Sequence, residues 1–153
     1  GLYAAANRCE GMYAHASGRF AANGDAQFGR WILRATTTNA TSTALLAGFS
    51  RNSRLSVSSG KTMSCKVTVK GIKSDGSAKA RFVRLVEITN VGGTTALDMS
   101  PEALGTDYNP SGCVCDITAD NTNDALDISV TGITGETWRL VAVIEGLEIA
   151  YGT

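Results

Sequence analysis

Apolar and polar residues alternate with a period of two along much of the chain. The clearest run covers residues 62–70, in which every odd position is apolar and every even position is Thr, Ser or Lys. Residues 126–131 repeat the pattern, with Leu, Ile and Val alternating with Asp, Ser and Thr. Such alternation predicts strands that bury one face and leave the other in water.

Turn-forming residues separate these patterned segments. Strands are expected at residues 31–35, 55–57, 62–70, 78–91, 113–119, 126–131 and 137–150, with a short apolar piece at 44–46. The segment Ser74-Asp75-Gly76-Ser77 predicts a hairpin turn, and residues 98–111, which hold both prolines, are the longest expected loop. Many short strands between turns are typical of an all-β fold, here an antiparallel β-sandwich or jelly roll.

The last expected strand, residues 137–150, is apolar on both faces. This indicates either a central strand of a sheet or a strand at a subunit interface. Residues 82–88 are also apolar on both faces, which indicates a bulge or an additional covered face.

A short repeat occupies the first thirty residues. Its unit is Gly, a variable residue, an aromatic residue, Ala, any residue, Ala, and then Asn or Ser, and copies begin at Gly1, Gly11 and Gly18. One unit buries almost nothing alone, so it needs stacked neighbours or copies from other chains. We therefore expect residues 1–29 to form a repetitive β shaft segment, of the β-roll or β-prism kind, ahead of a β-sandwich domain at 30–153. The alternative is a flexible Ala/Gly-rich leader.

Residues of this repeat are the candidates for a trimer interface. They are Tyr13, Ala14, His15, Ala16 and Phe20. For His15, a packed or interface position is favoured over a pH switch.

Composition narrows the functional classes. Charged residues make up 18% of the chain, and 14 basic residues balance 14 acidic ones. Low charge at zero net charge favours self-association and argues against a basic nucleic-acid surface. No apolar run is long enough for a membrane helix, and no signal-peptide pattern is visible, so we expect no membrane insertion.

The four cysteines, Cys9, Cys65, Cys113 and Cys115, are expected to be free thiols that pack as small hydrophobic side chains. Cys113 and Cys115 would lie on one face of an extended strand, about 7 Å apart, which disfavours a disulfide between them. Their spacing is no zinc signature either.

Catalytic chemistry finds little support. The single histidine, His15, lies in the repeat, so Ser-His-Asp and Cys-His arrangements are disfavoured. Four carboxylates cluster in the sequence: Asp116, Asp120, Asp124 and Asp127. Sugar hydrolysis and calcium binding remain alternatives there, but turn capping by aspartate is the favoured role. No catalytic residue, metal ligand or cofactor is assigned.

Exposed aromatic residues are the candidates for sugar contact. Trp138 opens an apolar strand and is expected in the core, and Trp31 is expected in the core or at an interface. Tyr108 lies in the long loop, and Asp107, Tyr108 and Asn109 are the candidate receptor-contact residues.

The order of several segments resembles one protein family. Residues 13–20, followed by Gly24-Asp25-Ala26-Gln27, resemble a signature of tail-fibre and appendage proteins of tailed bacteriophages. The same order continues through residues 31–34, 123–128, 130–132 and 137–142, whereas Cys113-Val114-Cys115 departs from it. The resemblance implies a C-terminal domain of a structural fibre protein with a short Gly/Ala-rich trimeric shaft repeat.

From this resemblance we expect a virion structural domain that terminates and trimerises a phage fibre or spike and also contacts host-surface glycans. The expected partners are two further copies of the chain, upstream fibre or virion proteins and a host glycan, without nucleic acid. The expected location is the virion, after assembly in the host cytoplasm. The first alternative is a dedicated carbohydrate- or receptor-binding module of a fibre or adhesin. A polysaccharide hydrolase is the second, and we expect no enzyme.

Overall fold

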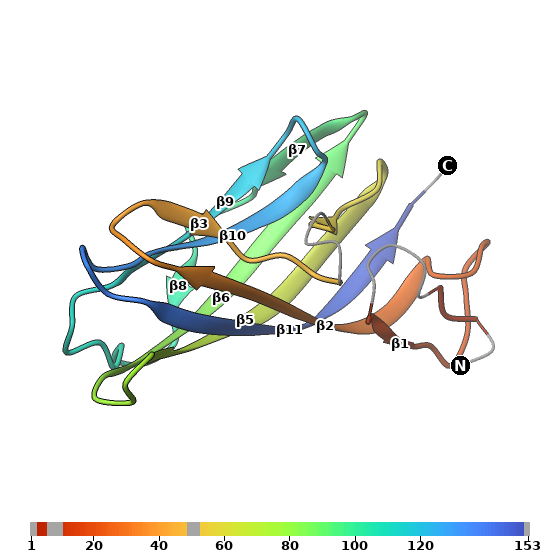
Figure 1. The fold of residues 1–153 in the computed structure, drawn as a ribbon. Coiled ribbons are helices and arrows are strands. Elements are labelled where there is room, and N and C mark those ends of the chain that lie inside the picture. The colour runs from red at the N-terminus through yellow and green to blue at the C-terminus, as the bar shows by residue number, and fades with distance from the viewer. Residues whose placement is uncertain (1–2, 6–10, 49–52, 152–153) are drawn as a thin grey trace.

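Two antiparallel sheets pack face to face (Figure 1). The structure is a computed structural model of the chain and describes residues 3–5, 11–48 and 53–151. The large sheet has the order β1 (Tyr13–His15), β2 (Ala26–Thr37), β11 (Trp138–Ala150), β5 (Lys61–Lys73), β6 (Lys79–Val91) and β7 (Thr94–Leu97), with β8 (Glu102–Ala103) also on β6. The small sheet holds β3 (Ser42–Ala44), β4 (Leu55–Ser56), β9 (Val114–Asp120) and β10 (Ala125–Thr131). The predicted antiparallel β-sandwich is confirmed.

The strand β10 organises the small sheet. It pairs along its whole length with β9, while β3 and β4 pair with its C-terminal and N-terminal parts. This sheet covers one face of the long strands β2, β11, β5 and β6 (Figure 1). No helix in the described part of the chain is long and apolar enough to cross a membrane.

The core lies between the two sheets. Trp31 and Trp138 are fully buried there, as the sequence predicted. The other large side chains of the core are Leu33, Leu45, Leu55, Met63, Ile88, Leu126, Ile128, Leu140 and Ile144. Burying one such side chain stabilises the fold by about 1.5–3 kcal/mol, so this cluster is the main source of stability.

Gly29 makes room for the Trp31 ring. A Cβ atom at this position would lie only 2.2 Å from the ring carbon Cη2 of Trp31. Any larger residue would therefore force the buried ring to move. The sequence carried no signal of this requirement, because it depends on the rotamer of a neighbour.

β11 lies between β2 and β5. Of the two explanations offered for its apolar faces, the central strand is therefore confirmed. One face carries Trp138, Leu140 and Ile144 into the core. On the other face Val141, Leu147 and Ile149 are 45%, 59% and 50% exposed. The second apolar face is thus not covered by the described part of its own chain.

The described part of residues 1–29 is continuous with the sandwich. β2 runs from Ala26 to Thr37, so the expected domain boundary between residues 29 and 30 falls inside a strand. β1 extends the large sheet by pairing Tyr13 with Arg30. Stacked shaft repeats are not seen in the described residues of this segment, and Cys9 and most of the first repeat unit lie outside them.

Two polar side chains hold this segment in place. The Asp25 carboxylate accepts hydrogen bonds from the backbone N–H groups of Phe20, Ala21 and Ala22 at 3.0, 2.6 and 2.7 Å. The Gln27 side chain accepts from the N–H of Ala5 at 2.9 Å and donates to its carbonyl at 3.2 Å.

Two short strands were missed by the sequence analysis. Gly92 and Gly93 have φ angles of +60° and +83° and join β6 to β7, as a two-residue hairpin turn requires. The sequence analysis ended a strand at these glycines and left residues 94–97 unassigned. β8 lies within the expected long loop and pairs with β6 over only two residues.

Three of the four cysteines are described, and all three carry free thiols, as predicted. Cys65 and Cys113 are buried, and Cys115 is half-buried. Burial raises the pKa of Cys65 to about 12 and that of Cys115 to about 11. These thiols are therefore protonated at neutral pH and pack as apolar groups.

Candidate functional site

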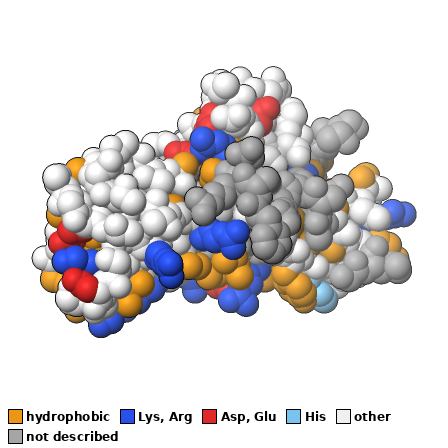
Figure 2. Space-filling model, viewed as in Figure 1, with side chains coloured by type: hydrophobic (Ala, Val, Ile, Leu, Met, Phe, Trp, Pro, Cys, Tyr) orange, Lys and Arg blue, Asp and Glu red, His pale blue; other side chains and the backbone are white. Residues whose placement is uncertain are grey.

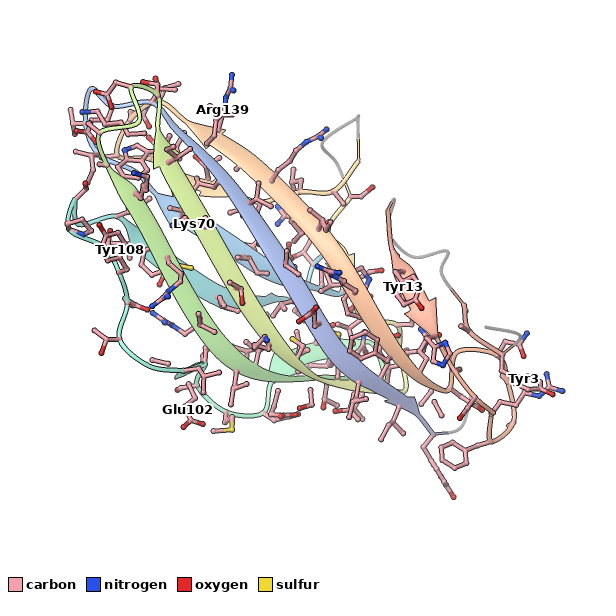
Figure 3. The ribbon with its side chains drawn as sticks, turned by 90° about the horizontal axis from the view of Figure 1, so that it is seen from below. Tyr3, Tyr13, Lys70, Glu102, Tyr108 and Arg139 are labelled. Carbon is pink, nitrogen blue, oxygen red and sulfur yellow. The ribbon has the colours of Figure 1, made fainter. Side chains whose placement is uncertain are left out.

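The outer face of the large sheet is left uncovered by the described elements (Figure 3). It consists of the alternate side chains of β2, β11, β5 and β6 that point away from the small sheet. Figure 3 looks onto this face, with Lys70, Tyr108 and Arg139 toward one end and Tyr13 toward the other. Strand register places its side chains in rows across the sheet, and the two ends differ in chemistry.

One end is apolar. Phe28 and Leu147 are direct register partners, and Ile149 follows Leu147 on the same face of β11. We call the group Tyr13, Phe20, Phe28, Leu147, Ile149 and Tyr151 the apolar end; its members are 37–95% exposed. Contiguous exposed apolar side chains of this kind mark interaction surfaces.

A short ionic row crosses the face between the Phe28–Leu147 pair and the cationic end, and Tyr13 lies at its edge, opposite Arg30. Glu145 lies between Arg30 and Lys66, with nitrogen–oxygen distances of 3.5 and 3.6 Å. Because these groups are partly exposed, each pair adds at most about 1 kcal/mol to stability. Glu145 thus neutralises part of the positive charge of Arg30 and Lys66, and the apolar and cationic ends remain chemically distinct.

The opposite end is cationic. Lys70 on β5 and Arg81 on β6 are direct register partners, and in the next row Arg139 and Lys79 flank Ile72. We call Lys70, Lys79, Arg81 and Arg139 the cationic end; all four are exposed. No carboxylate of the described residues lies within ion-pair distance of them. Figure 2 shows Lys and Arg side chains together with apolar ones along the lower edge of the molecule, where the large sheet lies.

The nearest acidic side chains at this end are already engaged. Lys73, on the inner side of β5, binds Glu136 at 3.1 Å and Asp75 at 3.4 Å. A hydrogen bond from the Trp138 indole and another from Lys73 lower the pKa of Glu136. These carboxylates neutralise Lys73 rather than the cations of the outer face.

A hollow of about 370 Å³ opens beside Arg139. Val141 and Thr36 form part of its wall on the large sheet, and Thr43 and Leu46 approach from the segment that crosses the edge of β2. Arg34 also lines the hollow, and its guanidinium donates to the carbonyl of Gly48 at 2.9 Å.

The predicted receptor-contact residues lie next to the cationic end. Tyr108 forms a β-bridge with Arg81 through hydrogen bonds of 2.7 and 3.1 Å, and its side chain is 53% exposed. Asp107 accepts two hydrogen bonds of 2.7 Å from Arg84, which lower the pKa of its carboxyl group. The Asn109 side chain donates a hydrogen bond to the carbonyl of Cys113 and accepts one from its backbone N–H. Of the three, Tyr108 presents the most accessible side chain.

The predicted trimer-interface residues separate into two groups. Tyr13, His15 and Phe20 are exposed, and two of them belong to the apolar end. Ala14 and Ala16 are only 8% exposed, because their side chains pack within the chain. An interface would therefore use the aromatic members of the repeat rather than its alanines.

Sequence reasoning missed most of the outer face. Phe28 was not named, whereas Leu147 and Ile149 belong to the segment 137–150, whose two apolar faces predicted a central strand or a subunit interface. The cationic end had only a partial signal: the predicted hairpin at residues 74–77 makes β5 and β6 neighbours, but nothing in the sequence places β11 beside β5.

The aspartate cluster of residues 116–127 works structurally. Asp120 accepts hydrogen bonds from the N–H groups of Thr122 and Asn123, and with Asp127 it pairs with Arg54. Asp124 accepts from the Thr95 hydroxyl at 2.9 Å. Within the described part of the chain, no group of three or more His, Cys, Asp or Glu side chains is placed to hold a metal ion.

Comparison with known proteins adds two distant likenesses. No family model and no curated protein matches the chain. One similar structure is the tailspike protein gp49 of Acinetobacter baumannii bacteriophage Fri1, a capsular polysaccharide depolymerase. Its identity is 12% and its TM-score 0.47, over 88% of this chain and 19% of that chain. Another is the tailspike protein of Acinetobacter phage vB_ApiP_P1, with 12% identity and a TM-score of 0.37, over 81% of this chain and 22% of that chain.

These structural neighbours are phage tailspike proteins, and this chain spans about a fifth of the length of each. At such TM-scores the likeness is no argument for a shared fold or activity. The function of the chain has to be inferred from its own residues.

Proposed function

We propose that the chain is a non-catalytic structural domain of a phage fibre or spike that forms a homotrimer, with glycan contact on the host surface as a second role. The observation that carries the proposal is the apolar end of the outer face. The register pair Phe28 and Leu147 exposes 37% and 59% of its surface on two central strands of the sheet.

Exposure on central strands is unusual for an isolated domain. A solvated sheet face normally alternates to polar residues, as β5 does with Thr62, Ser64 and Lys66. At the apolar end, β2 and β11 keep large apolar side chains at the solvent positions instead. Covering them with other copies of the chain removes that surface from water at about 25 cal/mol per Å².

Composition and resemblance support the same proposal. With 14 basic and 14 acidic residues, the chain has no net charge to keep copies apart. The proposal of three copies, and of a phage particle as their location, rests on the order of sequence segments that resembles fibre and appendage domains. Closed cyclic symmetry would bury the apolar end of every copy in the same way.

The non-catalytic part of the proposal is supported by the carboxylates. A glycoside hydrolase needs two carboxyl groups free to act as acid and as base or nucleophile. Asp120 and Asp127 are paired with Arg54, and Asp107 is paired with Arg84. Hydrolysis of a host polysaccharide by the purified chain would overturn this part.

Glycan contact is supported by a different region. Tyr108 is exposed on the β6 side of the cationic end, and a hollow lies on its other side, beside Arg139. Exposed aromatic side chains and hollows lined by hydrogen-bonding groups are both features of carbohydrate contacts. This leaves the apolar end for association and the opposite end for host contact.

Sedimentation equilibrium tests the trimer. Truncation before Arg30 would cut through β2, so point variants are preferable. We expect three times 15.9 kDa for the wild type and a monomer for Leu147→Asp. The matched control is Val114→Asp, because Val114 is 52% exposed on the small sheet, and this variant should stay trimeric. A wild type that is monomeric at its highest soluble concentration would contradict the proposal.

A further inference from the structure

The cationic end contains an electrostatic repulsion that lowers the stability of the sheet and that the fold itself does not explain. Lys70 and Arg81 occupy directly opposed positions on neighbouring antiparallel strands. Directly opposed like charges destabilise a sheet. Across the same sheet, by contrast, Glu145 is placed between Arg30 and Lys66, so opposite charges are matched where no ligand is needed.

The cations also lie in a regular array. One row across the sheet reads Arg34, Val141, Lys70 and Arg81, and the bridge to Tyr108 extends it. With about 4.8 Å between strands, the row spans about 14 Å from β2 to β6. The adjacent row adds Arg139 and Lys79, so a linear polyanion lying across the strands would meet several cations in succession.

The surface between the cations is apolar rather than acidic. Val141 and Ile72 are 45% and 43% exposed within these rows, and Tyr108 closes one side. A sugar ring presents both apolar C–H faces and polar substituents, so a polysaccharide with acidic groups matches both components. Duplex nucleic acid fits less well, because the whole chain has zero net charge.

A second copy of the chain is a poorer partner for this end. An acidic counterpart would have to lie on another part of the surface. Many of the described carboxylates are instead tied to internal partners, as with Asp107 to Arg84 and Asp120 and Asp127 to Arg54. This favours another molecule as the source of the complementary charge.

We propose that the cationic end, with the hollow beside Arg139, binds a polysaccharide that bears carboxylate groups. The hollow receives one substituent between Arg139 and the Thr36 and Thr43 side of its wall, and Lys70 and Arg81 bind further carboxylates along the row. This inference rests on the proposed host-surface role and names the chemistry of the ligand.

Trimerisation would strengthen such binding. Three cationic ends on one particle hold one polymer chain at a high effective concentration, so weak single sites give a stable attachment. Because the charges are exposed, the attachment weakens as salt screens them.

The experiment uses the full chain and three polymers. Isothermal titration measures binding to polygalacturonate, to the same polymer with its carboxylates fully methyl-esterified, and to inorganic polyphosphate. We expect binding to polygalacturonate, loss of binding on esterification and weaker binding to polyphosphate. Equal binding to the esterified polymer, binding that favours polyphosphate, or no binding to polygalacturonate would overturn the inference.

Variants locate the site. Lys70→Gln combined with Arg139→Gln should weaken polygalacturonate binding by about tenfold or more, since each removes charge-assisted hydrogen bonds. The matched control is Arg30→Gln combined with Lys66→Gln, which removes two cations from the ionic row of the same face. If the two double variants weaken binding equally, binding reflects general electrostatic attraction to the face, and the assignment of the site to the cationic end is wrong.

Sedimentation in the same buffers separates this inference from the proposed function. A wild type that is trimeric but does not bind polygalacturonate overturns only the ligand inference. A monomer that binds overturns the trimer and leaves the cationic end as a glycan site.

Discussion

The two ends of one sheet face differ in chemistry, although the central strand β11 contributes to both. At the apolar end, Phe28 and Leu147 are adjacent and gain by leaving water. At the cationic end, Lys70 and Arg81 are adjacent and repel each other. We propose that the first arrangement serves association and that the second binds an acidic ligand. One continuous sheet can present two chemically different ends because strand order and register decide which side chains meet.

A substitution at the buried side of the large sheet should lower the stability of the sheet and so affect both ends of its outer face. Gly29→Ala places a methyl group against the buried Trp31 ring, where a Cβ would lie 2.2 Å from the nearest ring carbon. We expect the free energy of unfolding to fall by about 1–3 kcal/mol, as for other overpacked cores. Urea denaturation measures the change.

The matched control for this prediction is Gly18→Ala. A Cβ at Gly18 meets no atom within 4 Å, so its stability should stay near that of the wild type. If the two variants are equally stable, Gly29 does not make room for Trp31, and the described packing beneath β2 is wrong.

Charge reversal at the cationic end should separate stability from binding. Lys70→Glu replaces a repulsive pair with an attractive one opposite Arg81, so the free energy of unfolding should rise by roughly 0.2–1 kcal/mol. The same change should weaken polygalacturonate binding. A thermal or urea melt run beside the titration measures both effects on one sample.

Lys66→Glu is the counterpart of this variant. Lys66 lies directly opposite Glu145, so the substitution creates a like-charged pair and should lower stability by a similar amount. If both substitutions change stability in the same direction, the cross-strand pairing does not govern these charges.

Acid should loosen the loop that carries Phe20 at the apolar end. The N–H of Ala21, with those of Ala22 and Phe20, lowers the pKa of Asp25 below its ordinary value of 3.8. A carboxyl group with a lowered folded-state pKa contributes stability above its unfolded pKa and loses it as the pH falls through the folded one. The loop that carries Phe20 should therefore loosen in acid.

Asp25→Asn removes this dependence. The difference in stability between the variant and the wild type should be largest at neutral pH and shrink at a pH below the folded-state pKa of Asp25. Urea midpoints at the two pH values measure it. A difference that does not change with pH would show that the ionised carboxylate does not hold the loop.

The sequence predicted the local features of the molecule well. Alternation along residues 62–70 and 126–131 predicted β5 and β10, and the apolar strands of Trp31 and Trp138 predicted their burial. Period-two patterning works here because it reports on the two faces of a single strand.

The position of the candidate site depends on strand order and register, which the sequence alone does not supply in full. The partners Lys70 and Arg81 meet because β5 and β6 form a hairpin with a particular register, and Arg139 joins them because β11 lies beside β5. Composition gave zero net charge and so hid a local concentration of cations on one face. The alanines of the repeat were expected at an interface, but strand pairing of β1 with β2 turned them inward.

The central claim, that one sheet face associates at one end and binds an acidic glycan at the other, is tested most directly by one sedimentation experiment. Fluorescently labelled oligogalacturonate is sedimented with the wild type and with Leu147→Asp, so that mass and bound ligand are read together. The account predicts a trimer that binds the oligosaccharide and a monomeric variant with the same affinity per copy, because a short oligosaccharide occupies a single cationic end. Equal masses for the two proteins, or a lower affinity per copy in the monomeric variant, would contradict the account.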